Sequence, residues 1–370
     1  MSRPAPACAI VGGGLGGLVT YTTLRHGGLG PDDIAVFGTD PDPASVFRAH
    51  TAAIRQVHMR SESNGHCYAR SFPGLAVRSA LRGASLRPLI DSVRDRFRPT
   101  VEEFLDHVAE ARVASGWDES FRCRRIERIR PVDDGFSLDD EGVFAHVLLA
   151  PGHPGLAYPR GLEDDPRVVH AYQPHGYAEE VAVVGAGMAA ATEWLNALAA
   201  GASVISVRRR EPARRPLNVE RQYFTKRGLA RFRRAGREER IALLRGFVAP
   251  SYPPGTEWDE PIARAVATGR FRVEPELNGA GQVICATGFR RGFQADPLLR
   301  DLVREHGLAT AEGWIVLDDD SSVPGLTDDA RTLALAGACA QWAHPGADTL
   351  VGMKYAARCL LRPVRRWRTR

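Results

Sequence analysis

Short apolar runs that end in glycine-rich turns recur along the chain. Residues 8–11 (CAIV) run into the turn at 12–17 (GGGLGG), and a helical stretch follows. Much later, residues 181–184 (VAVV) run into 185–190 (GAGMAA), again ahead of a helical stretch. Each pattern predicts a buried strand, a tight turn and a helix in that order. We therefore expect two strand–turn–helix units of the same kind.

Other apolar runs predict the remaining strands, and one capped segment predicts a clear helix. Thr100 and Glu103 have the spacing of a capping box, apolar residues follow with helical periodicity, and Gly116 ends the run. Further strands are expected at residues 34–37, 147–150, 203–207, 282–286 and 333–338, with hairpin-like runs at 124–129 and 135–138. The sequence thus predicts an α/β fold.

The first turn has a glycine at each position that a bound dinucleotide requires. Gly12 permits the tight turn, Gly14 lets the backbone approach a pyrophosphate, and Gly17 lets the helix pack closely on the strand. The helix N-terminus then offers free N–H groups and a partial positive charge to that pyrophosphate. An ordinary glycine-rich turn is the alternative interpretation.

The second turn repeats this spacing with Gly185, Gly187 and Ala190, so that alanine takes the third place. Two such units in one chain are more specific than either alone, and they predict two bound dinucleotides. We expect FAD at the first turn and NADPH at the second.

The strand that follows each unit ends where a ribose would lie. At the first site Gly38 stands where a carboxylate usually holds the ribose, so Asp40 is the candidate; a solvated loop acid is the alternative. At the second site Arg208, Arg209 and Arg210 follow the strand directly. Guanidinium groups pair well with a 2′-phosphate, which favours NADPH over NADH. A solvated basic strand end is the alternative there.

Composition narrows the class of protein. With 370 residues the chain is long enough for two domains, and no apolar run approaches the length of a bilayer span. The first strand begins too early for a signal peptide. The six cysteines form no C-x-x-C pair, so neither a redox dithiol nor a zinc ribbon is indicated. We expect no metal and infer a reducing, cytoplasmic location.

The net charge of +5 raises the question of nucleic-acid binding. The basic residues are nearly all arginine and are interleaved with acids over most of the chain, which suggests a coding bias. Aromatic residues among arginines at 223, 224 and 232 could stack on single-stranded nucleic acid, but a helical core face is favoured. We expect a small-molecule substrate and no nucleic-acid or membrane partner, and we leave a homodimer open.

Together the motifs resemble the class B flavoprotein monooxygenases: the flavin-containing, Baeyer–Villiger and N-hydroxylating enzymes. In that family the first glycine motif binds FAD, the second binds NADPH, and a strand ending in A-T-G-(F/Y) links the domains, as residues 286–289 would here. The resemblance implies two Rossmann-like three-layer domains, with the NADPH domain inserted into the FAD domain. It also implies cofactor contacts at Thr287, Gly288 and Gly337, although Ala338 stands where the family often has aspartate.

The expected domain boundaries follow from these motifs. Residues 1–166 would form the first segment of the FAD domain, residues 167–277 the NADPH domain, and residues 278–370 the second segment of the FAD domain. The strand at 283–286 is then expected to pack beside the first domain and not to continue the second.

The resemblance also suggests residues near the flavin. Arg60, Ser61 and Asn64 fall where the family places polar residues beside the flavin ring; a polar surface loop is the alternative. His344 precedes the last helix, whose N-terminus would face the flavin pyrimidine. A capping or core histidine is the alternative for His344, and His170 is expected to be structural.

The implied function is that of an FAD-dependent, NADPH-using monooxygenase. It would insert one oxygen atom from O2 into a small-molecule nitrogen, sulfur or carbonyl centre through a C4a-(hydro)peroxyflavin. Two alternatives stay open. One is an NADPH-dependent flavin reductase without oxygen transfer, and the other is a non-enzymatic flavoprotein that senses redox state.

Overall fold

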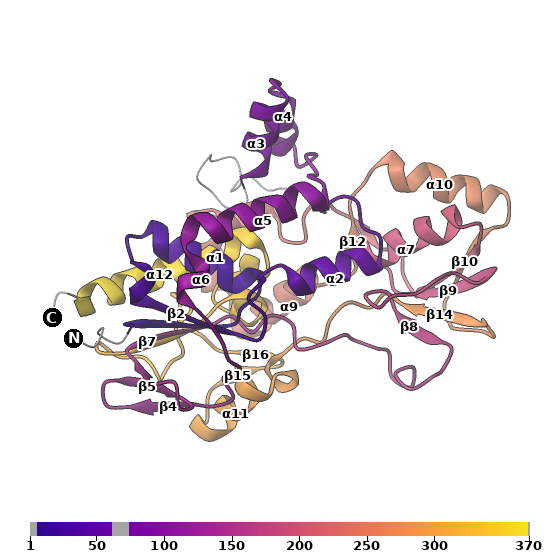
Figure 1. Cartoon of the computed structure of the whole chain (residues 1–370). Helices are drawn as coiled ribbons and strands as arrows, with labels where there is room; N and C mark the ends of the chain where they lie inside the picture. Colours follow the sequence, from indigo (N-terminus) through magenta and orange to yellow (C-terminus); the bar gives the residue numbers. More distant parts are fainter. Residues whose placement is uncertain (1–5, 61–73, 369–370) are drawn as a thin grey trace.

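Two parallel five-stranded sheets organise the molecule, and Figure 1 shows them at opposite ends of an elongated body. The computed structural model describes residues 6–60 and 74–368. In spatial order the first sheet contains β17 (Thr332–Leu335), β7 (His146–Leu149), β1 (Cys8–Val11), β2 (Ile34–Gly38) and β3 (Phe121–Cys123). The second contains β8 (Val168–His170), β14 (Gln282–Cys285), β9 (Glu180–Val184), β10 (Ser203–Val207) and β13 (Phe271–Glu274). The predicted α/β fold with two Rossmann-like sheets is confirmed.

The first sheet is the middle layer of three. Alternate residues of β1 point into different cores, because Ile10 packs with the helices and Val11 packs with the opposite layer. Helices α1 (Leu15–His26), α5 (Val101–Ser115) and α12 (Leu350–Arg368) cover one face. The other face is covered in part by a meander of β4 (Ile129–Val132), β5 (Gly135–Leu138) and β6 (Val143–Phe144). Strands buried on both faces explain the continuous apolar runs of the sequence.

The second sheet is covered mainly on one face. Helices α7 (Met188–Ala199) and α10 (Thr256–Ala267) bury Trp194 and Trp258 against it. The other face carries a smaller buried cluster around Ala182, Ile205 and Val283. Among the described residues, no helix is long and apolar enough to cross a membrane.

Further helices and two small sheets complete the fold, and the expected cap of α5 is present. The capping box of α5 is formed, since Thr100 Oγ1 accepts a hydrogen bond from the Glu103 backbone N–H at 3.0 Å. Helices α3 (Leu75–Arg82) and α4 (Arg87–Val93) stand out from the body in Figure 1. The other helices are α2 (Ser45–Ala53), α6 (Trp117–Ser120), α8 (Lys226–Arg234), α9 (Arg237–Phe247) and α11 (Pro297–His306). Two small sheets pair β11 (Ala213–Arg214) with β12 (Ser251–Tyr252) and β15 (Thr310–Ala311) with β16 (Trp314–Ile315).

The chain leaves the first sheet after β7 and returns to it only with β17. The expectation that residues 283–286 pack beside the first domain is nevertheless wrong, because β14 lies between β9 and β8 in the second sheet. Val283 and Ile284 are fully buried, as strand residues in the middle of a parallel sheet must be. The switch back to the first sheet therefore comes after β14 and not at residue 278.

The expected NADPH domain needs a second correction. Helices α8 and α9 lie between strands of the second sheet in sequence, yet they pack into the core below the first sheet. Phe232 of α8 and Leu244 of α9 are fully buried in the same cluster as Val147 and Leu335. Residues 219–247 therefore belong with the first sheet in space. The other expected boundaries stay predictions.

Candidate functional site

The two glycine turns have the same backbone geometry. Gly12 and Gly185 each have φ of +133°, which favours glycine. A Cβ on Gly12 would lie 2.1 Å from the Ala150 carbonyl oxygen, and one on Gly185 would lie 2.5 Å from that of Ala286. These are backbone contacts that no side-chain movement can relieve. Each turn therefore requires glycine because it passes directly over the end of a neighbouring strand.

The second glycine of each turn faces open space. A Cβ on Gly14 or Gly187 would meet nothing within 4 Å. Both residues are extended N-caps, with ψ of −166°, and neither α1 nor α7 has a side-chain cap or an acid in its first turn. The first N–H groups of both helices thus have room before them and no carboxylate of their own turn. This is a cradle that suits a pyrophosphate.

The third position differs between the two turns. A Cβ on Gly17 would lie 1.9 Å from the Gly12 carbonyl oxygen, so the first helix packs against its own turn as the motif predicts. Ala190 is fully buried at the equivalent place, so the second unit accommodates the methyl group.

The absence of an acid at the end of β2 has a steric cause. A Cβ on Gly38 would lie 2.6 Å from Gly13 Cα, so no side chain fits there. Asp40 is exposed, and its Oδ1 accepts a hydrogen bond from the Asp42 backbone N–H at 2.8 Å. Its backbone carbonyl approaches the place of a Cβ on Gly13 to 3.4 Å, which puts Asp40 beside the turn. Ribose binding by Asp40 stays a prediction.

The three arginines after β10 have different environments. The Arg208 guanidinium lies 5.0 Å from the centre of the Trp194 ring and 2.9 Å from Glu211 Oε1, and its side chain is 10 % exposed. Arg209 and Arg210 are exposed. Arg208 therefore packs against α7, and the two that follow it present their charges to solvent.

The chain passes between the two sheets twice, once after β7 and once after β14, and we call these two segments the crossings. The predicted linker residues Thr287 and Gly288 join them. Thr287 Oγ1 donates a hydrogen bond to the Ala157 carbonyl, and the Ala157 N–H donates to the Gly288 carbonyl at 2.9 Å. Gly288 has φ of +76°. Gly337 is buried, has φ of +75° and begins a short 3-10 turn after β17. Cofactor contacts by these residues stay predictions.

Arg60 connects distant segments. Its guanidinium donates to the Ser251 carbonyl at 2.7 Å, the Ser251 hydroxyl at 2.9 Å and the Arg215 carbonyl at 2.7 Å. Burial lowers the pKa of Arg60 to about 10. These bonds commit the side chain to holding the loops around β11 and β12. Ser61 and Asn64 lie outside the described residues.

His344 and His170 are both buried, and each accepts a backbone hydrogen bond from the residue two positions later. His344 Nδ1 accepts a hydrogen bond from the Gly346 N–H at 3.1 Å, and burial lowers the pKa of His344 to about 4. This geometry matches the capping alternative. His170 Nδ1 accepts from the Tyr172 N–H at 3.2 Å, and burial likewise lowers the pKa of His170 to about 4. Both rings are neutral at neutral pH.

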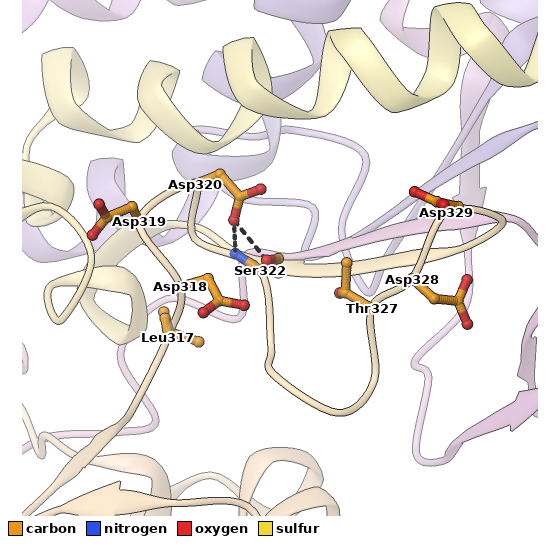
Figure 2. A pocket seen from close by; sticks show the side chains of 8 residues that line it. All are labelled: Leu317, Asp318, Asp319, Asp320, Ser322, Thr327, Asp328 and Asp329. Atoms are coloured by element: carbon orange, nitrogen blue, oxygen red, sulfur yellow. Dashed lines mark hydrogen bonds between the residues drawn. The ribbon is translucent and has the colours of Figure 1, made fainter.

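An acidic hollow of about 910 Å³ borders the outer edge of β17. Figure 2 shows the side chains that line it. Asp320 Oδ1 accepts hydrogen bonds from the backbone N–H and hydroxyl of Ser322, and Asp319 pairs with Arg233 at 3.3 Å. Among the described residues, no group of three or more His, Cys, Asp or Glu side chains is arranged to hold a metal ion. The lining residues are Leu317, Asp318, Asp319, Asp320, Ser322, Thr327, Asp328 and Asp329.

Sequence reasoning missed a column of rings where the chain crosses between the sheets. The His153 and Phe289 rings stack 4.8 Å apart, and Phe289 stacks on Tyr172 at the same distance. One signal was available, because the strand ends at residues 150–152 (APG) and 286–288 (ATG) are alike.

Comparison with known proteins identifies solved structures that share this fold. No family model and no curated protein matches the sequence. Solved structures do match, beginning with an ornithine N-hydroxylase from Kutzneria sp. 744 described with reduced FAD, NADP+ and L-ornithine. It has a TM-score of 0.74 and 16 % identity over 99 % of this chain and 100 % of that one. The chain has the fold of the class B flavoprotein monooxygenases.

Two further structures show the breadth of this monooxygenase-like fold. L-lysine 6-monooxygenase from Pseudomonas syringae matches with a TM-score of 0.69 and 16 % identity over 98 % of this chain and 99 % of that one. The bacillithiol disulfide reductase of Bacillus cereus matches with a TM-score of 0.60 and 13 % identity over 97 % of this chain and 98 % of that one. The resemblance inferred from the sequence is thus confirmed at the level of the fold, which oxygenases and reductases share.

Proposed function

We propose that this chain binds FAD at the first glycine turn and NADPH at the second, and works as a monooxygenase on a small molecule. One observation carries the proposal: two turns of equal backbone geometry each leave open space before an uncapped helix N-terminus. The oxygen acceptor would be a nitrogen, sulfur or carbonyl centre. A nitrogen centre is favoured because the similar structures include hydroxylases of ornithine and lysine.

Each part of the two turns has a task in this proposal. Gly14 and Gly187 let the backbone approach the two pyrophosphates, and the first turns of α1 and α7 supply N–H donors and positive potential. Arg209 and Arg210 are exposed at the strand end, where a 2′-phosphate would lie. The cofactors would supply the redox chemistry, in which hydride passes from NADPH to the flavin and the reduced flavin reacts with O2.

A reductase without oxygen transfer is the second candidate, favoured by the disulfide reductase that shares this fold. The chain has no C-x-x-C pair, so it lacks the dithiol that many such enzymes use. A redox sensor without catalysis is less favoured, since it would not need the second turn.

Labelled oxygen separates the candidates. Purified protein would be given NADPH and 18O2 with ornithine or lysine, and the products analysed by mass spectrometry. We expect one 18O atom in a hydroxylated amine for each NADPH consumed. NADPH oxidation that yields only hydrogen peroxide with amine, thioether and ketone substrates would contradict a monooxygenase and favour the reductase.

A further inference from the structure

The two sheets are equivalent strand by strand, and the equivalence extends to the loops that follow. In spatial order β17-β7-β1-β2-β3 corresponds to β8-β14-β9-β10-β13, so β7 and β14 occupy the same place beside the first strand of each unit. Gly152 after β7 has φ of +77°, and Gly288 after β14 has φ of +76°. Each is followed by a ring-bearing residue, His153 or Phe289.

These equivalent residues meet each other. The His153 and Phe289 rings stack with centres 4.8 Å apart and planes 7° from parallel. Tyr172 also stacks on Phe289, with ring centres 4.8 Å apart, and the His50 ring of α2 lies 4.9 Å from the Tyr172 ring. A contact between equivalent positions of two like units is the internal counterpart of a two-fold interface. We call His153, Phe289 and Tyr172 the ring column.

The ring column is tied to the last part of the first domain. His153 Nε2 lies 3.4 Å from Asp348 Oδ1, and Arg291 Nη1 donates to Asp348 Oδ2 at 3.0 Å. Burial alone would raise the pKa of Asp348, but His153 and Arg291 hold it below its usual value. Asp348 ends the 3-10 turn that leads into α12. The column therefore connects both crossings with the helix layer of the first sheet.

Backbone hydrogen bonds run alongside the rings. The Ala157 N–H donates to the Gly288 carbonyl at 2.9 Å, and the Arg290 N–H donates to the Gly155 carbonyl at 2.8 Å. The two crossings are thus held as a short antiparallel joint, in which Phe289 pairs with Leu156.

We propose that the ring column fixes the orientation of the two glycine turns, and that His153, Phe289 and Asp348 are positioning residues for hydride transfer between their cofactors. The inference rests on the proposed binding of FAD and NADPH. Ala150 and Ala286, whose carbonyls lie against the two turns, stand three residues before His153 and Phe289. A shift of the two rings would therefore also move Ala150 and Ala286, and with them the two glycine turns. Transfer rates depend steeply on such alignment.

The test compares variants that remove the ring contact with variants that keep it. Phe289→Leu and His153→Leu remove the stack, while Phe289→Tyr keeps it and His153→Phe keeps it without the Asp348 contact. Phe293→Leu is the matched control, because Phe293 is also partly buried but packs into the core below the first sheet. Each purified variant would be assayed for FAD content, NADP+ affinity, the anaerobic rate of flavin reduction by NADPH, and amide hydrogen exchange.

We expect the two leucine variants of the joint to retain FAD and NADP+ while flavin reduction slows by about tenfold to a hundredfold. Exchange at the Ala157 and Arg290 amides should become faster in these variants and stay unchanged in Phe293→Leu and Phe289→Tyr. His153→Phe should show intermediate loss, because the Asp348 contact is gone. Unchanged exchange at both amides in the leucine variants, or an equal change in Phe293→Leu, would overturn the proposal that the rings hold the joint. Absence of bound flavin, or absence of flavin reduction by NADPH, in the wild type would overturn the proposed function instead, and exchange at the two amides would still test the joint.

Discussion

Gly14 and Gly187 are the residues at which structure and proposed chemistry can be separated most cleanly. Because a Cβ at either position meets nothing within 4 Å, a larger side chain fills only the open space that the proposed function assigns to a cofactor. Gly14→Val should therefore fold but lose FAD. Gly187→Val should keep FAD and lose NADPH binding, so each variant is the control for the other. Flavin content and NADP+ titration measure the two losses, and a folded Gly14→Val protein with full FAD would contradict the first site.

The arginines after β10 predict the nucleotide preference. Arg209 is exposed, whereas Arg208 is held against Trp194 and Glu211. A charge-assisted hydrogen bond contributes about 1.5–3 kcal/mol, so Arg209→Ala or Arg210→Ala should lower the preference for NADPH over NADH by about tenfold to a hundredfold. Arg208→Ala should instead destabilise the fold by about 1 kcal/mol through the lost ring contact. The measurement is flavin reduction by each nucleotide under anaerobic conditions; equal efficiency of both in the wild type would mean that the arginines are a solvated strand end.

Buried histidines give the stability a definite pH dependence. Burial lowers the pKa of His146 and of His344 from 6.5 to about 4. Between these values the unfolded chain binds more protons than the folded one, so this contribution is complete above about pH 6.5 and is lost as the pH falls toward 4. Urea unfolding at pH 7 and pH 5 should show the decrease. His344→Asn keeps a capping acceptor and removes one titrating ring, so its decrease should be smaller; an identical decrease would show that His344 does not contribute.

Helices α8 and α9 are the elements whose position the sequence does not reveal. Their apolar residues show that one face is buried, but nothing in the local pattern tells which of two sheets covers that face. The ends of the first strands were easier to predict, because a position where a neighbouring carbonyl excludes any side chain must be glycine, and glycine is visible in the sequence. The same reasoning failed for residues 283–286, since a fully buried parallel strand has the same apolar run in either sheet.

The packing of α8 makes a prediction at the scale of the element. Phe232→Ala removes a fully buried ring from the core below the first sheet and should destabilise it by about 3–5 kcal/mol. Phe271→Ala makes a comparable cavity in the core of the second sheet. Thermal release of FAD should therefore occur at a lower temperature in Phe232→Ala, with a smaller effect in Phe271→Ala. The reverse order would contradict the assignment of residues 219–247 to the first core.

For the whole molecule, the sequence predicts the fold class because both glycine units and the returning strand β17 leave local signals. It does not predict the ring column, because stacking of His153 on Phe289 depends on how two separate crossings meet. Nor does it predict the commitment of Arg60 to backbone carbonyls of distant loops. Such contacts arise only when the two units are placed side by side.

The central claim is that one chain binds two dinucleotides, FAD and NADPH, between which hydride is transferred. One measurement tests this claim most directly. Wild-type protein would be purified, its flavin identified after denaturation, and the intact protein titrated with NADPH in the absence of oxygen. The account predicts one FAD per chain and full loss of the oxidised-flavin absorbance with one equivalent of NADPH. A folded protein that neither carries nor takes up FAD, or a bound FAD that NADPH does not reduce, would contradict it.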